Sequence, residues 1–434
     1  MIRGGRWPCL AGTLHTAWIG LRNFIVRSAN PGGSVRWVVL EGTPPPNGLQ
    51  PFTPLPDTLT LMNRSQASPA TSENEDLTLL PVPVDASRVA QALIDWFPDA
   101  ARDLPWRRHR SGYHGLVSEA MLQQTQVDRV VPAFLRFIER FPTFEDLAEA
   151  PEEDVVASWQ GLGYYRRARN LHAASKMVVE SFGGSLPNSL EDLQSLPGVG
   201  RYTAGALASI VHGQPAPIVD GNVARVLARL ATHPGTPGER AFEAWAWTLA
   251  SDLATAASQP GVANEALMEL GALVCTRHDP DCARCPLRED CRAHARGEPQ
   301  LIPPPRRPVT RKTVHHHLVL VRRDDDVLLI RRGERGLWAG MWEPPAVESS
   351  RLLDPEDVIK GLPARVNALR AVATFEHRTT HRDVVFHVHH ADAGDPRTDS
   401  EVRWQPLDRL GDIGISNPHL KAIALLPNSD RNRS

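Results

Sequence analysis

Residues 195–230 read SLPGVGRYTAGALASIVHGQPAPIVDGNVARVLARL, and this stretch decides the fold that we expect. Capping residues before it predict a short helix that ends at Pro197, and residues 201–211 predict a second helix. Without a Cβ, Gly198 and Gly200 accept unusual backbone angles and let N–H groups approach an anion at the second helix's N-terminus. We expect a phosphate group there, although a plain turn between two helices explains LPGVG equally well.

Asp220 stands just before a third predicted helix, in which Val223, Val226, Leu227 and Leu230 follow helical spacing. An isolated Asp in this place is most simply an N-cap, and Asn222 could serve the same purpose. The alternative is a carboxylate held beside a ligand by the start of a helix.

Composition limits the class of protein. A chain of 434 residues predicts two or three domains, and 41% hydrophobic with 23% charged residues is ordinary for a globular protein. No apolar run is long enough to cross a membrane. The net charge of −2 argues against a strongly basic nucleic-acid binder, so contacts with a polyanion must come from local patches.

Residues 1–84 are rich in Pro, Gly, Ser and Thr and show no sustained period, so we predict a disordered extension. The first 40 residues contain Arg but no Asp or Glu, which is compatible with an organellar targeting segment. Translation from Met62 is a second explanation of this segment. From residue 85 to about 300 the pattern predicts an all-α domain.

Within that domain, SEAMLQQTQV places Glu119 among Leu116, Val117, Ala120 and Met121. A carboxyl group in apolar surroundings has a raised pKa and becomes available as a proton donor. A solvated Glu on the polar face of a helix is the alternative that the periodicity leaves open.

Six motifs occur in an order that resembles the adenine DNA glycosylases of the MutY type, members of the helix-hairpin-helix superfamily. They are ARDLPWR, SEAMLQQTQV, GLGYYRRARNLH, LPGVGRYTAG, DGNVARVLAR and NEALMELGALVC, within residues 85–295. The resemblance implies that Glu119 protonates N7 of a flipped adenine and that Asp220 stabilises the positive sugar left behind. It places Asn222 near that sugar and Tyr202 in the pocket of the flipped base.

The same resemblance implies two further groups of residues. Around the flipped base it places Arg102, Trp106, Arg107, Leu122, Val127 and Glu265. Since an enzyme that extrudes a base must fill or brace the gap in the duplex, it assigns Gln124 and Tyr164 to that task. Gly198 and Gly200 are then expected to contact DNA.

Four of the five cysteines, Cys275, Cys282, Cys285 and Cys291, give the spacing C-x6-C-x2-C-x5-C. Such a cluster indicates a reducing compartment and one cofactor site, and spacing alone allows either zinc or an iron-sulfur cluster. The resemblance implies a [4Fe-4S] cluster. Arginines at 277, 284, 288 and 292 are expected to make the loop a DNA-docking patch.

Residues 301–312 read LIPPPRRPVTRK and predict an extended linker before a second domain at 313–427, with a tail at 428–434. In that domain we predict strands at 315–322, 327–332, 371–377 and 383–390, and helices at 355–360 and 418–426. This pattern is that of a mixed α/β domain. His387 and His389 alternate as strand residues do, which favours a strand over a metal site there.

GLWAGMWEPP, at 336–345, resembles the Nudix-like C-terminal domain of adenine glycosylases, but the acidic helix R-E-x-x-E-E-x-G of Nudix hydrolases is absent. We therefore do not predict pyrophosphate hydrolysis. The resemblance implies that the loop FEHRTTH, at 375–381, reads 8-oxoguanine, with Thr380 in place of the family's Ser and with His381. The family's aromatic residue before that Ser is missing here.

Together these features predict a monofunctional base-excision-repair enzyme that removes adenine opposite 8-oxoguanine or guanine in duplex DNA. Tyr202 stands where the related endonuclease III type has a Lys, so no Schiff base is expected. The alternatives are a thymine-mismatch glycosylase and a non-catalytic damage-binding protein. We expect a monomer without membrane contact, in the cytoplasm of a bacterium, or in an organelle or nucleus if the N-terminal segment is a targeting signal.

Overall fold

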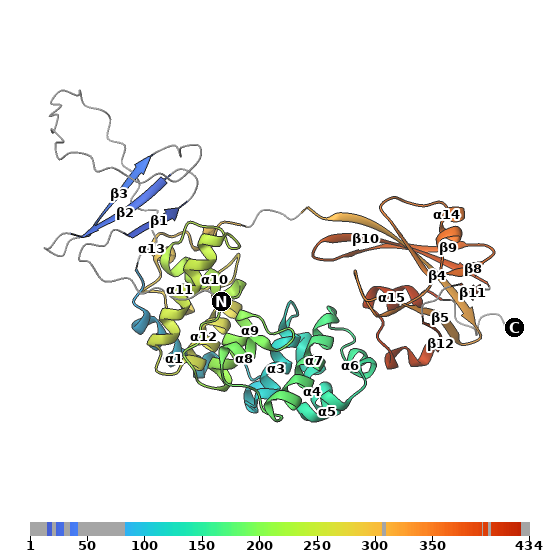
Figure 1. The fold of residues 1–434 in the computed structure, drawn as a ribbon, viewed down its shortest axis with the longest axis horizontal. Coiled ribbons are helices and arrows are strands. Elements are labelled where there is room, and N and C mark those ends of the chain that lie inside the picture. Colours follow the sequence, from blue (N-terminus) through green and yellow to red (C-terminus); the bar gives the residue numbers. More distant parts are fainter. Residues whose placement is uncertain are drawn as a thin grey trace, which may run out of the picture. The chain divides into compact units, whose positions relative to one another are not determined.

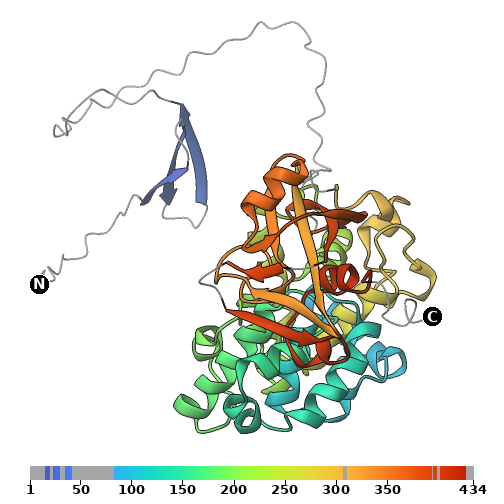
Figure 2. The same ribbon diagram turned by 90° about the vertical axis from the view of Figure 1, so that its right-hand side faces the viewer.

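The computed structural model divides into two compact units, Met1–Glu73 and Asn74–Ser434. It describes residues 83–305, 310–392, 394–397 and 401–426, together with three N-terminal strands (Figure 1, Figure 2). None of the helices in this described part has the length and apolar character needed to cross a membrane.

The first unit contains a three-stranded antiparallel sheet, in the order β1 (His15–Ile19), β2 (Asn23–Ala29) and β3 (Val35–Glu41). The prediction of a segment without secondary structure is therefore wrong at these three strands. Apolar and β-branched residues, such as those in VRWVVLE of β3, favour strands. This preference outweighs the tendency of the surrounding Pro and Gly residues to prevent secondary structure. The rest of residues 1–82, Met62 included, lies outside the described residues, as do 306–309 of the predicted linker and the 428–434 tail.

The next part of the chain is all-α, as predicted. Its first lobe holds α2 (Pro105–Arg108), α3 (Gly112–Leu122), α4 (Val127–Arg140), α5 (Phe144–Glu149), α6 (Glu152–Ser158), α7 (Arg166–Phe182), α8 (Leu190–Ser195) and α9 (Arg201–Ala206). A π-helical turn, η2 (Leu207–Val211), continues α9. Phe134, Phe137 and Trp159 are among the buried side chains of this lobe.

A second lobe is built on a separate cluster of buried side chains. It holds α1 (Ala86–Ala100), α10 (Gly221–Ala231), α11 (Arg240–Ala256), α12 (Pro260–Leu273) and the short α13 (Arg292–Ala295). Leu93, Leu227, Phe242 and Leu270 are fully buried in its core. Removing this much apolar surface from water is the main force that holds each lobe together.

The helical hairpin forms where residues 195–211 predict it. Ser189 caps α8 by accepting a hydrogen bond from the N–H of Asp192, and α9 begins after Gly200. Gly198 has φ +82°, and a Cβ there would lie 2.7 Å from the Cβ of Asn170, so this position requires glycine. Gly200 is extended, with φ −88°, and a Cβ would meet open space. The prediction of unusual backbone angles is right for Gly198 and wrong for Gly200.

The C-terminal domain is a mixed α/β domain, as predicted. Its main sheet has the order β12 (Val402–Pro406), β5 (Asp326–Arg331), β4 (Lys312–Arg323), β10 (Arg382–Ala391) and β9 (Arg370–Arg378). β4 and β10 are parallel, and the other neighbours are antiparallel. Short strands β6 (Trp342–Glu343) and β7 (Ala346–Ser349) extend it, and β8 (Ala364–Val366) pairs with β11 (Gly394–Pro396).

Both faces of this sheet are buried. Leu318 and Leu320 of β4 face α15 (Asn417–Ile423), whereas Val319 and Val321 face α14 (Pro355–Gly361). The predicted strands and helices of this domain are all present within a few residues of their expected bounds. The loop predicted at 375–381 is shorter than expected, because residues up to Arg378 belong to β9 and only 379–381 form the turn to β10.

Candidate active site

Glu119 lies on α3 and is buried, with 8% of its surface exposed. Burial, together with the negative charges of Asp220 and Glu265, raises its pKa to about 7. Among the described residues, no side chain donates a hydrogen bond to its carboxyl group. Near neutral pH this group can therefore hold a proton or release it.

Asp220 is the N-cap of α10. Its Oδ1 accepts hydrogen bonds from the N–H groups of Asn222, at 2.9 Å, and Val223, at 2.7 Å. The Asn222 side chain donates to Oδ2 at 3.4 Å and accepts at its own oxygen from Arg225. Asp220 is thus the N-cap that the sequence predicts. Two backbone N–H groups also fix the direction of its half-buried carboxylate.

Tyr202 lies in the first turn of α9 between the two carboxylates. Its hydroxyl donates to the sulfur of Met268 at 3.7 Å. Burial, and then the charges of Glu119 and Asp220, raise the pKa of Tyr202 well above its ordinary value. The phenol stays neutral at physiological pH.

A network of buried ion pairs supports the expected base pocket. Arg102 makes two hydrogen bonds of 2.8 Å to Glu269, and Arg107 bonds to both Glu265 and Glu269. Burial opposes the charge on Glu269, but hydrogen bonds from Arg102 and Arg107 outweigh it and lower its pKa to about 2. Sequence reasoning missed Glu269, although its i, i+4 spacing from Glu265 puts both carboxylates on one face of α12.

The apolar members of the expected pocket come from the other lobe. Trp106 packs edge-to-face on Phe134, with ring centroids 5.2 Å apart. Leu122 lies three residues after Glu119 at the end of α3, and Val127 begins α4. All three are partly buried, so some of their surface remains accessible to a ligand.

Gln124 and Tyr164 occupy two turns with left-handed backbone, at φ 57° and 50°. Both are exposed, Tyr164 by 51%. Such conformations are uncommon for residues other than glycine and cost free energy, so the surrounding structure must hold them.

Arg167, from the motif GLGYYRRARNLH, holds both turns. Its guanidinium donates to the carbonyls of Ala120, Met121 and Gln123 beside the first turn. It also donates to Thr125 Oγ1 and to the carbonyls of Leu162 and Gly163 beside the second. Burial lowers the pKa of Arg167 to about 10, which leaves it charged at neutral pH.

The structure brings two of the predicted DNA contacts together, although they lie 216 residues apart. The hydroxyl of Tyr164 lies 3.3 Å from Oγ1 of Thr380, and His381 is exposed beside it in the β9–β10 turn.

A cleft of about 1230 Å³ is lined by both left-handed turns, by residues 334–341, which include Trp338, and by Thr379. Its lining includes six arginines, at 166, 167, 169, 331, 335 and 378, against Glu152 and Glu334. This is the local positive patch that the overall composition lacks.

The four cysteines of the predicted cofactor loop line one cavity, beside Arg229. None of them is in a disulfide. The buried guanidinium of Arg229 donates to Cys275 Sγ at 3.2 Å and to the carbonyls of Thr276, Arg277 and Ile302. The arginines at 277, 284, 288 and 292 are all exposed around this loop.

The spacing of these sulfur atoms bears on the identity of the cofactor. Across the described residues, one group of three His, Cys, Asp or Glu ligand atoms lies within 4.8 Å of one another, and it contains no cysteine. Four thiolates on a single zinc, with bonds of about 2.3 Å, would lie about 3.8 Å apart. Four thiolates in one loop could hold either a zinc ion or an iron-sulfur cluster.

Comparison with known families agrees with this architecture. Residues 117–251 match the model of the HhH-GPD superfamily base excision DNA repair proteins, and residues 316–425 match the NUDIX domain. The chain thus combines a region that matches the HhH-GPD superfamily with a later region that matches the NUDIX domain.

Within that class, the similarity is to proteins named adenine DNA glycosylase, which confirms the MutY-type resemblance. The human one is 46% identical over 220 residues, covering 49% of this chain and 40% of its own length. The one from Arabidopsis thaliana is 37% identical over 303 residues, covering 61% and 48%. The chain spans about half the length of the curated relatives it matches. A solved structure described as a thermostable thymine-DNA glycosylase covers 48% of this chain and 97% of its own, with 25% identity and a TM-score of 0.43.

Proposed function

We propose that this protein is an adenine DNA glycosylase, which hydrolyses the N-glycosidic bond of adenine opposite 8-oxoguanine or guanine in duplex DNA. One observation carries the proposal: Glu119, with a pKa of about 7, is buried where the charges of Asp220 and Glu265 act on it. Adenine is a poor leaving group until it is protonated, and an acid with a pKa near the working pH is well suited to protonate it.

In the proposed reaction, Glu119 donates its proton to N7 of a flipped adenine, and the glycosidic bond breaks with the electron pair leaving on the base. Asp220, held by the N–H groups of Asn222 and Val223, places its negative charge beside the oxocarbenium-like sugar. Glu119, now ionised, can take a proton from the attacking water. Arg102, Trp106, Arg107, Leu122, Val127 and Glu265 would enclose the base.

DNA would be held by the positive cleft, with phosphate at the Gly198–Gly200 turn. Gln124 and Tyr164 would enter the space that the flipped nucleotide leaves, because they are exposed on turns of fixed geometry. Thr380 lies against Tyr164, which supports a role for it and His381 in reading the base opposite the adenine.

The four cysteines 275, 282, 285 and 291 would hold a [4Fe-4S] cluster. When bound, the cluster would fix the fold of this loop rather than supply redox chemistry to the hydrolysis. Arg229 would donate a hydrogen bond to one of its thiolates, and the exposed arginines of the loop would contact DNA phosphates.

The test is a panel of four duplexes, which contain A opposite 8-oxoguanine, A opposite G, T opposite G, and A opposite T. We expect adenine release from the first two only. Release of thymine would favour the thymine-mismatch alternative, and tight binding without release of any base would favour a damage-binding protein.

A second test concerns the neutral phenol of Tyr202, which cannot form an imine with the sugar. Borohydride should trap little wild-type protein on DNA, and the abasic product should keep an intact backbone until alkali is added. A Tyr202→Lys variant should gain a trapped adduct if the side chain faces the sugar. Efficient trapping of wild type would contradict the monofunctional reaction.

A further inference from the structure

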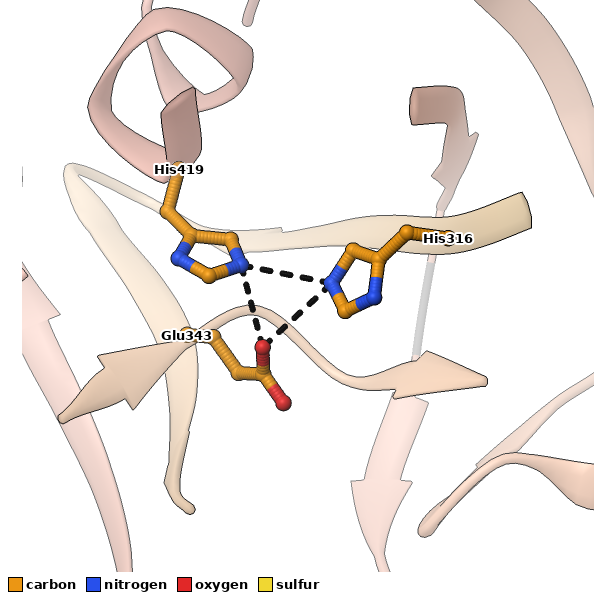
Figure 3. A group of neighbouring side chains, drawn as sticks. All are labelled: His316, Glu343 and His419. Carbon is orange, nitrogen blue, oxygen red and sulfur yellow. Dashed lines mark hydrogen bonds and ion pairs between the residues drawn. The ribbon is translucent and has the colours of Figure 1, made fainter. Parts of the chain in front are cut away.

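Three side chains from distant parts of the sequence converge in the core of the C-terminal domain, away from the carboxylates and the cysteines described above. His316 comes from β4, Glu343 from β6 and His419 from α15 (Figure 3). Both imidazoles are fully buried, and 11% of the Glu343 side chain is exposed. His316 is on the same face of β4 as Leu318 and Leu320, which is why it meets α15.

The three facing atoms form a nearly equilateral triangle. His419 Nε2 lies 3.0 Å from Glu343 Oε2 and 3.2 Å from His316 Nε2, and His316 Nε2 lies 3.4 Å from the same oxygen. In a tetrahedral site with metal–ligand bonds of about 2.0–2.1 Å, ligand atoms are about 3.3–3.4 Å apart. One ion can therefore reach all three atoms with small movements of the side chains.

A shared proton satisfies this arrangement less well than a cation does. A hydrogen atom on one ring nitrogen points along one side of the triangle, and the lone pairs of the remaining atoms still face each other. A cation on the axis of the triangle attracts all three lone pairs at once. In addition, Glu343 and Glu348 share one guanidinium, that of Arg332, so the cluster has an excess of negative charge when both imidazoles are neutral.

The outer nitrogen atoms of both rings have polar neighbours that would orient them. His419 Nδ1 is 2.6 Å from Ser416 Oγ, and His316 Nδ1 is 3.3 Å from Glu348 Oε1. Imidazoles that bind metals usually interact through the other nitrogen with a carboxylate or hydroxyl group in this manner. Arg332 contacts both oxygens of Glu343, but a carboxylate oxygen has two lone pairs and can accept from Arg332 while it binds an ion.

We propose that His316, Glu343 and His419 bind a divalent transition-metal ion, with zinc as the ion of choice because two imidazoles and one carboxylate are ligands it favours. The ion would join β4, β6 and α15, and a water molecule would complete the coordination. Trp338, whose ring centroid is 4.8 Å from that of His419, and Ser416 both line the positive cleft. The site would thus fix one wall of the cleft.

The experiment compares zinc content in the full-length protein and in two conservative variants, His316→Gln and His419→Gln. Glutamine keeps an amide near the position of Nε2 but removes the imidazole lone pair. His390→Gln is the matched control, because His390 lies on β10 next to Asp392 and outside the triad. All four proteins keep the same cysteines, so any zinc in the cysteine loop contributes equally.

After dialysis against zinc and removal of loosely bound metal, wild type and His390→Gln should each retain one more zinc per chain than the triad variants do. X-ray data at the zinc absorption edge should place that ion between His316, Glu343 and His419. Circular dichroism checks that the variants are folded, and Glu343→Gln provides a third variant if one histidine variant is not. Equal zinc content in all folded variants, or no zinc signal at the triad, would overturn the proposal in favour of a protonated ion-pair cluster.

Discussion

At the scale of single residues, Glu119 determines how the proposed reaction depends on pH. Its pKa is about 7 because it is buried and because Asp220 and Glu265 are nearby, and the reaction needs the protonated form. The single-turnover rate of adenine release should be highest below pH 7 and fall roughly tenfold per pH unit above it. A rate that stays constant from pH 6 to pH 9 would contradict the role of Glu119 as the acid.

The same residue gives a direct test by substitution. Glu119→Gln should bind mismatched DNA like wild type but lose at least about 100-fold in adenine release, because an amide cannot protonate N7. Glu139→Gln, on the exposed face of α4, is the control and should keep its activity. Quench-flow measurement of base release and a binding titration separate the two effects, and release at the wild-type rate would disprove the assignment.

Ionisation of Glu119 should also lower the free energy of unfolding at alkaline pH. Its pKa rises from an ordinary 4.5 to about 7 on folding, so the folded state holds the proton more tightly. Stability is then greatest below pH 4.5, falls as the pH rises from 4.5 to 7, and is lower by about 3 kcal/mol above pH 7, where the group is ionised in both states. Denaturant unfolding should therefore show Glu119→Gln to be more stable than wild type at pH 8.5, with little of this difference left at pH 4.

Single residues could be proposed for roles from the sequence only where a motif contains them. Glu119, Asp220 and the four cysteines belong to short motifs, and the structure places them in mutually consistent surroundings. Glu269, Arg167 and the triad of His316, Glu343 and His419 depend on tertiary contacts, such as those of Arg102 with Glu269, Arg167 with Gln123 and His419 with Glu343. No motif in the sequence identifies these partners.

At the scale of the element, the turns that carry Gln124 and Tyr164 depend on one buried side chain. Arg167→Lys would leave most of the six hydrogen-bond acceptors of its guanidinium without a donor, because an ammonium group cannot bridge both turns. Since each buried unsatisfied group costs about 1–3 kcal/mol, we expect a loss of at least about 3 kcal/mol in the free energy of unfolding.

Adenine release by Arg167→Lys should fall at least tenfold, because the two exposed side chains lose their fixed directions. Arg136→Lys is the matched control, since its side chain is exposed on α4 and does not line the cleft. Unfolding curves and single-turnover assays on both variants provide the measurement. Wild-type behaviour of Arg167→Lys would show that the turns hold their shape without it.

Helices and strands were predictable where burial of one face produces a periodic pattern of apolar residues in the sequence. In the long strands β4, β5, β9 and β10, apolar residues alternate with polar ones or follow one another without interruption. The sequence predicts each of these strands. β6, β7, β8 and β11 have two to four residues, which is too short for a period, and β12 is mostly half-buried. Their existence depends on the neighbouring strands that supply hydrogen bonds.

At the scale of the whole molecule, the proposed division of labour places chemistry in the HhH-GPD domain and reading of the opposite base in the Nudix domain. The double variant Thr380→Val, His381→Ala should still release adenine opposite G. Its preference for 8-oxoguanine over guanine should fall about 3- to 30-fold, as expected for the loss of one or two hydrogen bonds.

Thr374→Val is the control for this variant, because Thr374 is exposed on β9, outside the 379–381 turn, and does not line the cleft. Competition between the two mispairs in one reaction measures the preference directly. An unchanged ratio would place recognition of the opposite base elsewhere in the chain.

The positions of Glu119 and Asp220 in two different cores bear on whether a partly folded chain could damage intact DNA. Glu119 belongs to a helix of one hydrophobic core, whereas Asp220 and Glu265 belong to helices of the other. In the proposed reaction, a chain in which only one core has folded has half of the pair and should not cut a glycosidic bond. Since adenine is a normal base, a catalyst that survived partial unfolding would damage intact DNA. Under the proposed function, splitting the pair between two cores would make partly folded copies inactive.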